Sequence, residues 1–478
     1  MEYRKNQKVI VTIEDMGMNG EGIGRIDGYT LFVKDAVVGD VAEAVLTKVK
    51  KNYAYAKMLH ILTPSKDRIE APCDVHRQCG GCQIQAMSYR AQLAFKQRKV
   101  RNDLIRIGGI DAEQLDKIME PIVGMPGDGL RYRNKAQYPV GRDKNGKPVA
   151  GFYAGRTHAI IPAKDCLLGP EENREIIRIV LSHMERYGVE PYDESAGTGL
   201  VRHIMIRKGF SSHQIMVCLV VTKGEIPEEK ELVERLAGIS GMKSIFLNVQ
   251  PDPTNVILGR ENILLWGSAC IEDSIHMCDA EADFSHTRES LSYLISPLSF
   301  YQVNPVQTER MYSQALHYAG LHGSETVWDL YCGIGTISLF MARRAGCVMG
   351  VEIVEQAVTD ARENAARNGI ENASFLVGKA EEILPAYYAD QTGGFSHPDV
   401  IVVDPPRKGC DEKCLETMVL MQPEKIVYVS CDPATLARDV NVLCRNGYVL
   451  KKVRAFDNFP QTVHVETVTL LCRENAES

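Results

Sequence analysis

The sequence lacks a long apolar run at its start, where signal peptides and membrane anchors are commonly found. The opening stretch, MEYRKNQKVIVTIED, has neither the uninterrupted apolar core of a signal peptide nor a span of about twenty apolar residues. We therefore expect a cytoplasmic protein without membrane association. Internal repeats and low-complexity tracts are also missing, and with 45% hydrophobic and 24% charged residues the composition argues against a disordered or fibrous protein.

An excess of positive charge is missing too. The chain has 55 Lys and Arg against 62 Asp and Glu, a net charge of -7, although nucleic-acid-binding proteins need cations for phosphate contacts. The cations are nevertheless clustered. Residues 89–101 contain five Lys and Arg and no acid, and residues 131–158 contain seven with only Asp143 against them. These clusters are compatible with RNA binding and equally with ordinary solvated faces.

The length of 478 residues exceeds what one hydrophobic core supports, so we expect a multidomain protein. Residues 1–62 contain short alternating runs separated by Gly-rich turns, which predicts a small OB-like β-barrel. Residues 48–57 interleave four lysines with Tyr53 and Tyr55, a mixture typical of barrels that bind nucleic acid. The tyrosines could also be structural.

The rest of the chain divides into two further parts. Residues 63–292 mix strand and helix patterns, which predicts a central α+β domain, with a helix over 89–107 that ends at Gly108 and Gly109. Residues 293–478 alternate strands with helices, which predicts a doubly wound, Rossmann-like α/β domain with a parallel sheet. In such a sheet ligands bind at the carboxyl ends of the strands.

Glycines in VWDLYCGIGTISL predict a cofactor site at this edge. Gly333 and Gly335 fall in a turn between strand and helix, but Ser338 replaces the third glycine of the dinucleotide fingerprint, which favours a methyltransferase over a dehydrogenase. Glu352 ends the next strand, where a carboxylate can accept hydrogen bonds from both ribose hydroxyls. A solvated strand-end Glu is the alternative.

The motif Asp404-Pro405-Pro406-Arg407 follows a later buried strand. Its two prolines hold the backbone extended, so Asp404 is fixed at the rim of the ligand crevice. Methyltransferases of exocyclic amines have an aromatic residue at the position of Arg407, so amine chemistry is disfavoured.

Cys431 is the candidate nucleophile. It follows a predicted buried strand and precedes a helix that begins near Pro433, and a helix N-terminus lowers the pKa of a thiol. A thiolate that adds to carbon 6 of a uracil ring would activate carbon 5, after which a base must remove the carbon 5 proton. Glu466 is the best candidate for that base, with Asp432 and Asp439 as rivals and Thr462 and His464 as possible orienting residues. A structural buried cysteine remains the alternative for Cys431.

Fourteen cysteines in a long chain without an export signal indicate reduced thiols, metal ligands or nucleophiles. Three lie within ten residues, in CDVHRQCGGCQ, and a fourth stands far downstream in PAKDCLLGP. The four are Cys73, Cys79, Cys82 and Cys166. Four thiolates can bind zinc or an iron–sulfur cluster, and the irregular spacing favours the cluster. Unrelated buried cysteines are the alternative.

Together these segments resemble the bacterial 23S rRNA (uracil-5-)-methyltransferases, RNA-modifying enzymes with an N-terminal TRAM domain. The resemblance covers nearly the whole chain and is carried by the barrel, the cysteine cluster and the motifs SPLSFYQVN, DLYCGIG, DPPRKG, VSCDPATLARD and FPQTVHVE. It implies transfer of a methyl group from S-adenosylmethionine to carbon 5 of a uridine in 23S ribosomal RNA. RNA is the implied partner, and no obligate protein partner is expected.

The resemblance also implies residue roles. It makes Cys431 the nucleophile and Glu466 the proton acceptor. The residues implied to contact S-adenosylmethionine are Gln302, Tyr331, Glu352 and Asp404, and those implied to hold a four-iron, four-sulfur cluster are Cys73, Cys79, Cys82 and Cys166. It further suggests that the 89–107 helix packs on the catalytic domain. Two positions depart from the family pattern: Asp432 stands where Asn is commoner, and Tyr301 where Phe is common.

Two other functions fit the same sequence. One is the same reaction on the T-loop uridine of transfer RNA. The other is a non-catalytic RNA-binding or iron–sulfur protein built on a methyltransferase scaffold.

Overall fold

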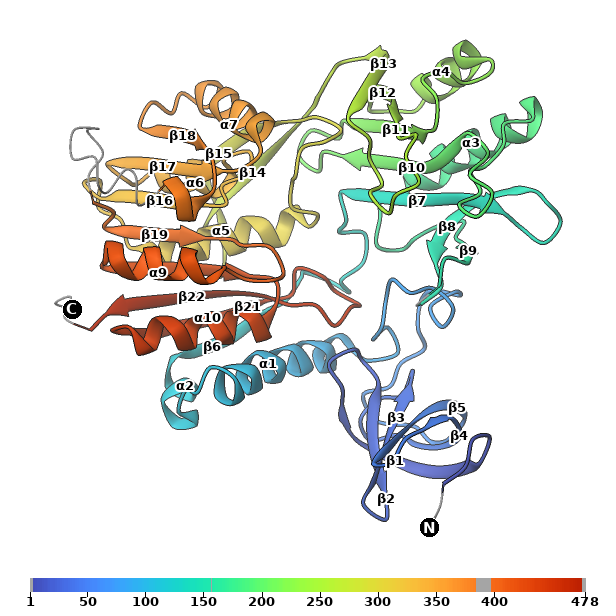
Figure 1. Cartoon of the computed structure of the whole chain (residues 1–478), viewed down its shortest axis with the longest axis horizontal. Helices are drawn as coiled ribbons and strands as arrows, with labels where there is room; N and C mark the ends of the chain where they lie inside the picture. The colour runs from blue at the N-terminus through green and yellow to red at the C-terminus, as the bar shows by residue number, and fades with distance from the viewer. Residues whose placement is uncertain (1–2, 156, 384–396, 475–478) are drawn as a thin grey trace.

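The N-terminal part of the chain is a closed β-barrel. The computed structural model describes residues 3–155, 157–383 and 397–474, coloured from blue to red along the chain in Figure 1. Five strands close the barrel in the order β1-β2-β3-β5-β4, with alternate side chains such as Leu31 and Val33 in its core. They are β1 (Lys8–Met16), β2 (Gly22–Ile26), β3 (Tyr29–Lys34), β4 (Val41–Val49) and β5 (Tyr53–Thr63). The predicted small barrel is therefore confirmed.

A seven-stranded sheet forms the middle of the molecule. Its order is β13-β12-β11-β10-β7-β8-β9, and helices α3 (Glu172–Tyr187) and α4 (Glu229–Ala237) pack on it. The strands are β7 (Lys135–Arg142), β8 (Pro148–Tyr153), β9 (Ile160–Pro162), β10 (Val201–Lys208), β11 (Ile215–Val221), β12 (Met242–Val249) and β13 (Glu261–Gly267). The β11 side chains are all buried, as expected for an uninterrupted apolar run.

The C-terminal sheet has eight strands in the order β18-β17-β16-β19-β20-β22-β21-β6, and those from β18 to β20 are parallel. Its strands are β6 (Met119–Val123), β16 (Thr326–Leu330), β17 (Cys347–Glu352), β18 (Ala373–Val377), β19 (Val400–Val403), β20 (Lys425–Ser430), β21 (Tyr448–Phe456) and β22 (Glu466–Arg473). The predicted Rossmann-like sheet is confirmed.

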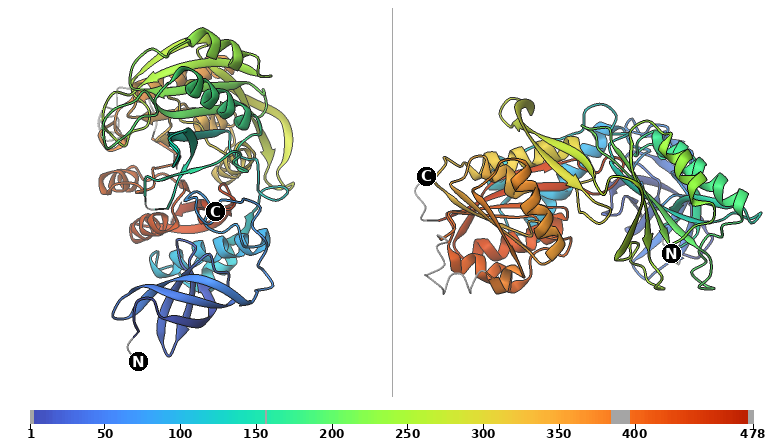
Figure 2. Two further views of the ribbon diagram at one scale, coloured as in Figure 1. Left: turned by 90° about the vertical axis from the view of Figure 1, so that its right-hand side faces the viewer. Right: turned by 90° about the horizontal axis from the view of Figure 1, so that it is seen from above.

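Helices cover both faces of the C-terminal sheet (Figures 1 and 2). One face is covered by α5 (Pro305–Ala319), α6 (Thr336–Ala342) and α7 (Glu355–Arg367). The other is covered by α1 (Tyr89–Arg106), α9 (Glu412–Met421) and α10 (Pro433–Arg445). The sheet is thus buried on both sides, so that its strand ends are the accessible edge.

Several segments from the middle of the chain belong spatially to the C-terminal sheet. β6 pairs in parallel with β21. Helix α1 packs against α10, and its Val100 and Leu104 are buried. Helix α2 (Ala112–Ile118) also contacts β21. The hairpin of β14 (Ile271–Asp279) and β15 (Ser285–Ile295) packs on α5 and α7. Residues 63–292 therefore contribute to both sheets.

The helices of the described part of the chain include none with both the length and the apolar character that crossing a bilayer requires.

Candidate active site

A cavity of about 710 Å³ opens at the carboxyl ends of the parallel strands. Four of the residues that line it lie at the carboxyl ends of neighbouring strands, where a parallel sheet binds its ligands. They are Tyr331 after β16, Glu352 at the end of β17, Asp404 after β19 and Cys431 after β20. All six side chains singled out for catalysis and cofactor binding line this cavity: Gln302, Tyr331, Glu352, Asp404, Cys431 and Glu466. Side chains far apart in sequence are thus brought to one site.

The backbone after β16 leaves room for a ligand. Gly333 and Gly335 have φ of 55° and 83°, in the left-handed region that favours glycine. A side chain at Gly335 would meet Ala361 and Phe375 at 3.2 Å, whereas one at Gly333 would extend into open space beside the cavity. Tyr331 has a φ of 70°, an uncommon conformation for a residue other than glycine. Strain at this point is consistent with a functional turn.

Glu352 is held in place by the same turn. Its Oε2 accepts a hydrogen bond from the backbone N–H of Gly333 at 3.1 Å, and its Oε1 accepts one from Val354 at 2.9 Å. Each carboxylate oxygen has two lone pairs, so both oxygens can still accept from a ribose hydroxyl. The site therefore suits a nucleoside cofactor.

Two acids lie deeper in the site. The Gln302 side-chain amide donates to Asp404 Oδ2 at 3.3 Å, but burial still raises the pKa of Asp404 to about 7. Asp329 in β16 is 1% exposed, and burial raises its pKa to about 7 although the Ser338 hydroxyl donates to it. Asp329 is not among the residues predicted from the sequence, although an acid within an apolar strand is a signal for it.

Cys431 lies between β20 and α10, and it is partly buried. Burial, followed by the nearby carboxylates of Glu466 and Asp404 and by Asp432, raises the pKa of the Cys431 thiol to about 12, while Arg407 opposes this shift. The sequence argument expected the helix N-terminus to lower this pKa. In the structure this pKa is raised instead, because burial and the nearby acids have a larger effect than the helix terminus and the Arg407 guanidinium.

Glu466 begins β22 and is 3% exposed. Burial, followed by the charge of Asp404, raises the pKa of Glu466 well above its ordinary value. Its two rivals have structural roles. Asp432 caps α10 by accepting from the backbone of Ala434 and Thr435 at 3.0 and 3.2 Å. Asp439 is fully buried, where it accepts from the Tyr428 hydroxyl at 2.6 Å and the Cys410 N–H at 2.9 Å.

The loop 457–465 leads from β21 to Glu466 and also lines the cavity, through Phe459 and His464. Burial and neighbouring cations lower the pKa of His464 to about 4, so its ring is neutral near pH 7. The Thr462 hydroxyl donates to the Phe459 carbonyl at 2.8 Å and accepts from the His464 N–H at 3.2 Å. Thr462 therefore braces the loop, and His464 faces the site.

Helix α1 holds this loop from behind. The Lys96 ammonium bonds the Asp457 carboxylate and the Phe459 carbonyl, the latter at 2.9 Å, and both charged side chains are fully buried. Lys99 donates to the Val463 carbonyl at 3.1 Å. Two cations of the 89–101 cluster therefore face the protein interior. The sequence showed the cluster but not this orientation.

The four clustered cysteines line a second cavity, of about 340 Å³. Three come from the loop before α1, and the fourth from the loop between β9 and α3. Burial and the charges of Cys166 and Cys79 raise the pKa of Cys82 to about 12, which reflects how close these thiols lie. All of them are free thiols. This donor set is that of a zinc or iron–sulfur site.

Backbone packing supports such a site. The Gly81 N–H donates to Cys79 Sγ at 3.3 Å, and a side chain at Gly80 would meet the Tyr153 carbonyl at 3.0 Å. On the other wall, Arg131 pairs with Asp165 and donates to the Cys166 carbonyl at 3.2 Å. Each of the two cysteine-bearing loops is therefore braced by protein contacts. These features fit a four-thiolate group.

Comparison with known proteins identifies the family. A family model described as tRNA (Uracil-5-)-methyltransferase matches residues 282–474, and a TRAM domain model matches residues 4–59. An uncharacterized RNA methyltransferase of Clostridium tetani is 46% identical over 98% of this chain and 97% of its own length. One from Listeria monocytogenes is 47% identical over 98% of each chain.

A solved structure extends the likeness to the whole fold. It is the crystal structure of the Pyrococcus abyssi tRNA (uracil-54, C5)-methyltransferase in complex with S-adenosyl-L-homocysteine. It superposes with a TM-score of 0.73 and 25% identity over 97% of this chain and 100% of the other. With its barrel, its methyltransferase sheet and these relatives, the chain belongs to the family of S-adenosylmethionine-dependent RNA (uracil-5-)-methyltransferases with a TRAM domain.

Proposed function

We propose that this enzyme methylates carbon 5 of a specific uridine in 23S ribosomal RNA, with Cys431 as nucleophile and Glu466 as proton acceptor. The observation that carries the proposal is that a thiol and a buried carboxyl line the same cavity as the expected cofactor residues. We propose that Gln302, Tyr331 and Glu352 hold S-adenosylmethionine together with Asp404. This donor supplies an electrophilic methyl group on a sulfonium centre.

The reaction divides between two side chains. Cys431 loses its proton to solvent, and the thiolate adds to carbon 6 of the uracil ring, forming a sulfur–carbon bond. Carbon 5 then attacks the methyl group, and a carbon–carbon bond forms as the methyl–sulfonium bond breaks. Glu466 takes the carbon 5 proton, and the electron pair left behind restores the 5,6 double bond while the bond to Cys431 Sγ breaks. Both side chains therefore react in their deprotonated forms.

We propose that the surroundings of Cys431 couple its reactivity to a bound donor. The pKa of Cys431 is raised to about 12 by burial and by two acids. A cation bound beside those acids would offset their effect and so lower the pKa of the thiol when the donor site is filled. We propose that this coupling protects the thiol from unproductive chemistry.

Phe300 and Arg407 are suited to receive the target base at the mouth of the cavity. Phe300 is 66% exposed although it lines the cavity, and Arg407 is also exposed. Exposed aromatic and guanidinium groups stack on unpaired bases, and a uridine must leave its helix to reach Cys431. We propose that these two side chains hold the flipped nucleotide.

We propose that the work is divided along the chain. Residues 1–62 bind RNA, residues 63–292 shape the RNA-binding surface around the cysteine site, and residues 293–478 catalyse methyl transfer. The helix at 89–107 acts with the catalytic part, because Lys96 and Lys99 bond its loop.

We propose that Cys73, Cys79, Cys82 and Cys166 hold a four-iron, four-sulfur cluster with a structural role, because methyl transfer moves no electrons to or from a metal. Protein purified without oxygen should be brown and contain about four irons per chain. Stoichiometric zinc without iron would refute the cluster. Lys164→Ala, beside these ligands in sequence, is a control that should keep the metal.

A second candidate substrate is transfer RNA. It is favoured by the whole-chain likeness to a tRNA (uracil-54, C5)-methyltransferase. We prefer ribosomal RNA because the barrel, the cysteine motif and the catalytic motifs together resemble the ribosomal enzymes. The test compares 5-methyluridine in 23S rRNA and tRNA from a deletion strain carrying the wild-type gene or its Cys431→Ser variant. Loss from rRNA alone is expected with the variant, and loss from tRNA alone would overturn the preference.

A further inference from the structure

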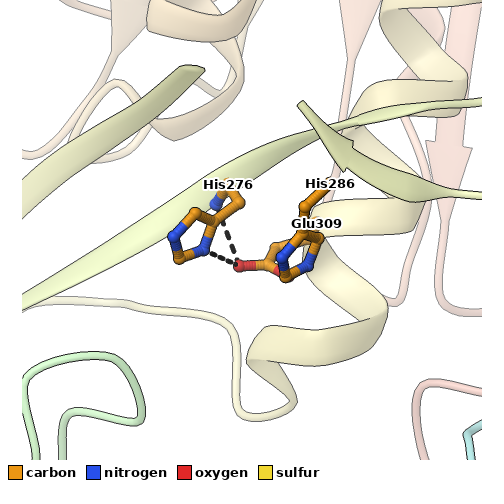
Figure 3. Close-up of side chains that lie close together, drawn as sticks. All are labelled: His276, His286 and Glu309. Atoms are coloured by element: carbon orange, nitrogen blue, oxygen red, sulfur yellow. Dashed lines mark hydrogen bonds and ion pairs between the residues drawn. The ribbon is translucent and has the colours of Figure 1, made fainter. Parts of the chain in front are cut away.

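Three side chains outside both cavities converge on one point (Figure 3). His276 comes from β14, His286 from β15 and Glu309 from the first turns of α5. His276 Nδ1 lies 2.9 Å from Glu309 Oε1, and His286 Nε2 lies 2.9 Å from Oε2. The imidazole rings are stacked, with centroids 4.8 Å apart and planes 8° from parallel. The methyl-transfer mechanism uses none of these residues.

The charge of Glu309 is otherwise poorly compensated. The residue is only 7% exposed, and besides the two rings it accepts a hydrogen bond from the His276 backbone N–H at 2.9 Å. Among the ion pairs of the described residues, Glu309 has no lysine or arginine partner. A buried carboxylate is costly unless it is paired or coordinates a metal. This arrangement therefore has room for a cation.

We propose that His276, His286 and Glu309 bind a divalent transition-metal ion, with zinc as the best match. His276 Nδ1 and His286 Nε2 each lie 2.9 Å from one of the two Glu309 oxygens. Tetrahedral zinc holds neighbouring nitrogen and oxygen ligands roughly 3.3 Å apart, so a small widening of these pairs admits the ion. All three ligand atoms lie within 4.8 Å of one another. Two imidazoles and one carboxylate are the ligands that zinc prefers, and they disfavour magnesium and calcium.

Binding needs a tautomeric change and a rotation of at least one imidazole, because the in-plane lone pairs of stacked, parallel rings do not meet at one ion. Each neutral imidazole would present a lone pair at the nitrogen that faces Glu309 and carry its proton on the other nitrogen. His286 is largely exposed, with a side-chain exposure of 57%, so an ion can enter from solvent and retain water as a further ligand.

The position of the site indicates a structural role. His276 and His286 flank the turn of the β14–β15 hairpin, which is a two-stranded sheet of its own. Glu309 lies on α5, whose N-cap Asn304 follows Gln302 of the active-site cavity. A bound ion would therefore fix the hairpin to the helix that begins beside the methyl-donor site.

The test titrates zinc into protein that keeps its cysteine-bound metal. Wild type is compared with His286→Ala, a change at an exposed side chain that should leave the fold intact. The control is His317→Ala, on the exposed face of α5. Calorimetry should show about one more zinc per chain in wild type and the control than in His286→Ala, or binding weakened at least about tenfold in that variant. Zinc should also raise the melting temperature of the wild type and the control only.

Crystals of the zinc-treated wild type should show an anomalous peak between the three side chains at the zinc absorption edge. Equal zinc stoichiometry and equal melting temperatures in wild type and His286→Ala would overturn the proposal. The proposal would also fail if the melting temperature depended on pH through these three residues but did not change with zinc. That behaviour belongs to a hydrogen-bonded His–Glu–His triad. Either failure leaves the methyl-transfer proposal untouched.

Discussion

At the scale of single residues, the active site combines a thiol and acids that hinder one another's ionisation. The pKa of Cys431 is raised to about 12 and that of Asp404 to about 7, while that of Glu466 is raised well above its ordinary value. Since the proposed chemistry needs the thiolate and the Glu466 carboxylate, the bound cofactor and RNA must favour these ionised forms.

Replacing Glu466 with Gln should separate the two halves of the reaction. The amide is nearly isosteric but cannot take the carbon 5 proton, so methyl transfer proceeds and release of Cys431 stalls. Denaturing gels should show a methylated enzyme–RNA adduct, with turnover reduced at least about a hundredfold. Asp432→Asn, which keeps the cap of α10, is the matched control and should turn over. Normal turnover by Glu466→Gln would mean that another base acts.

Asp404 should make stability depend on pH. Its pKa is about 7 in the folded protein against an ordinary value of 3.8, so the folded state binds more protons between these values. The free energy of unfolding therefore falls as pH rises from about 4 to about 7. Asp404→Asn removes the penalty, and urea unfolding without cofactor should find it more stable than wild type at pH 8. The gain should be about 1.4 kcal/mol for each tenfold difference in the proton affinity of Asp404 between the folded and unfolded states.

The same comparison at about pH 4 should show little difference, because wild-type Asp404 is then protonated. Asp143→Asn, at an exposed acid on the central sheet, serves as control and should bring no gain at pH 8. A variant less stable than wild type at pH 8 would contradict the raised pKa. The Asp404 variant should also bind S-adenosylmethionine more weakly.

At the scale of elements, helix α1 supports the loop that carries the active-site side chains. Lys96 and Asp457 form a buried pair across 361 residues of sequence, and Gln92 exchanges hydrogen bonds with Gln461 at 2.9 and 3.0 Å. Removing one partner of a buried ion pair leaves an uncompensated charge. The helix is therefore a positioning element for Phe459, His464 and Glu466.

Lys96→Met should accordingly destabilise the protein by about 3–5 kcal/mol, because Asp457 stays buried without a cation. The double variant Lys96→Met with Asp457→Asn should recover part of this loss in urea unfolding. Arg101→Ala, also on α1, breaks a solvent-accessible pair with Asp116 of α2 and should change stability little. If Lys96→Met were as stable as Arg101→Ala, the buried pair would have no supporting role.

Sequence patterns predicted the elements that carry the site better than they predicted their surroundings. Cys431 and Asp404 follow buried apolar strands, and such strands are visible in a sequence because both faces of a parallel sheet are covered. The pairing of β6 with β21 joins distant segments, so no local pattern reveals it. The raised pKa of Cys431 depends on Glu466 and Asp404 across the cavity, which spacing along the chain does not give.

At the scale of the whole molecule, the barrel, the cysteine-bearing loop and the catalytic loop meet in one small hydrophobic cluster. Its buried members are Met16, Val37, Ile84, Ala86, Met87, Phe95 and Val463. Gly20 of the barrel has a φ of 86°, and a side chain there would meet Val463 and Gln83 at 3.0 Å. The barrel therefore docks closely against the loop that leads to Glu466.

This docking places an RNA-binding surface in a fixed relation to the cavity. On the barrel, Phe32, Tyr53 and Tyr55 form an aromatic group with ring centroids 5.5–5.8 Å apart. Both tyrosines lie on β5, which also carries the exposed Lys57. The other exposed lysines are Lys48 on β4 and Lys50 and Lys51 between β4 and β5. Aromatic and basic groups together suit single-stranded RNA.

Changes on this surface should weaken RNA binding without touching chemistry. Tyr53→Ala should cost about 1–3 kcal/mol of binding free energy through lost base stacking. Lys50→Ala with Lys51→Ala should reduce the salt dependence of log K by about 1–2. Fluorescence anisotropy at several salt concentrations measures both, with Lys230→Ala on α4 as control. Affinity and salt dependence equal to wild type in all variants would remove the barrel surface from RNA binding.

The account depends most on the covalent role of Cys431. RNA that contains 5-fluorouridine at the target position cannot lose its carbon 5 substituent, so after methyl transfer the enzyme should remain bound to it through Cys431 Sγ. Mass spectrometry of the digested adduct should find the RNA on the peptide that contains Cys431, in wild type and in Cys347→Ser, a control at the amino end of β17. Cys431→Ala should form no adduct and no 5-methyluridine. Undiminished methylation by a folded Cys431→Ala protein that still binds S-adenosylmethionine would contradict the account.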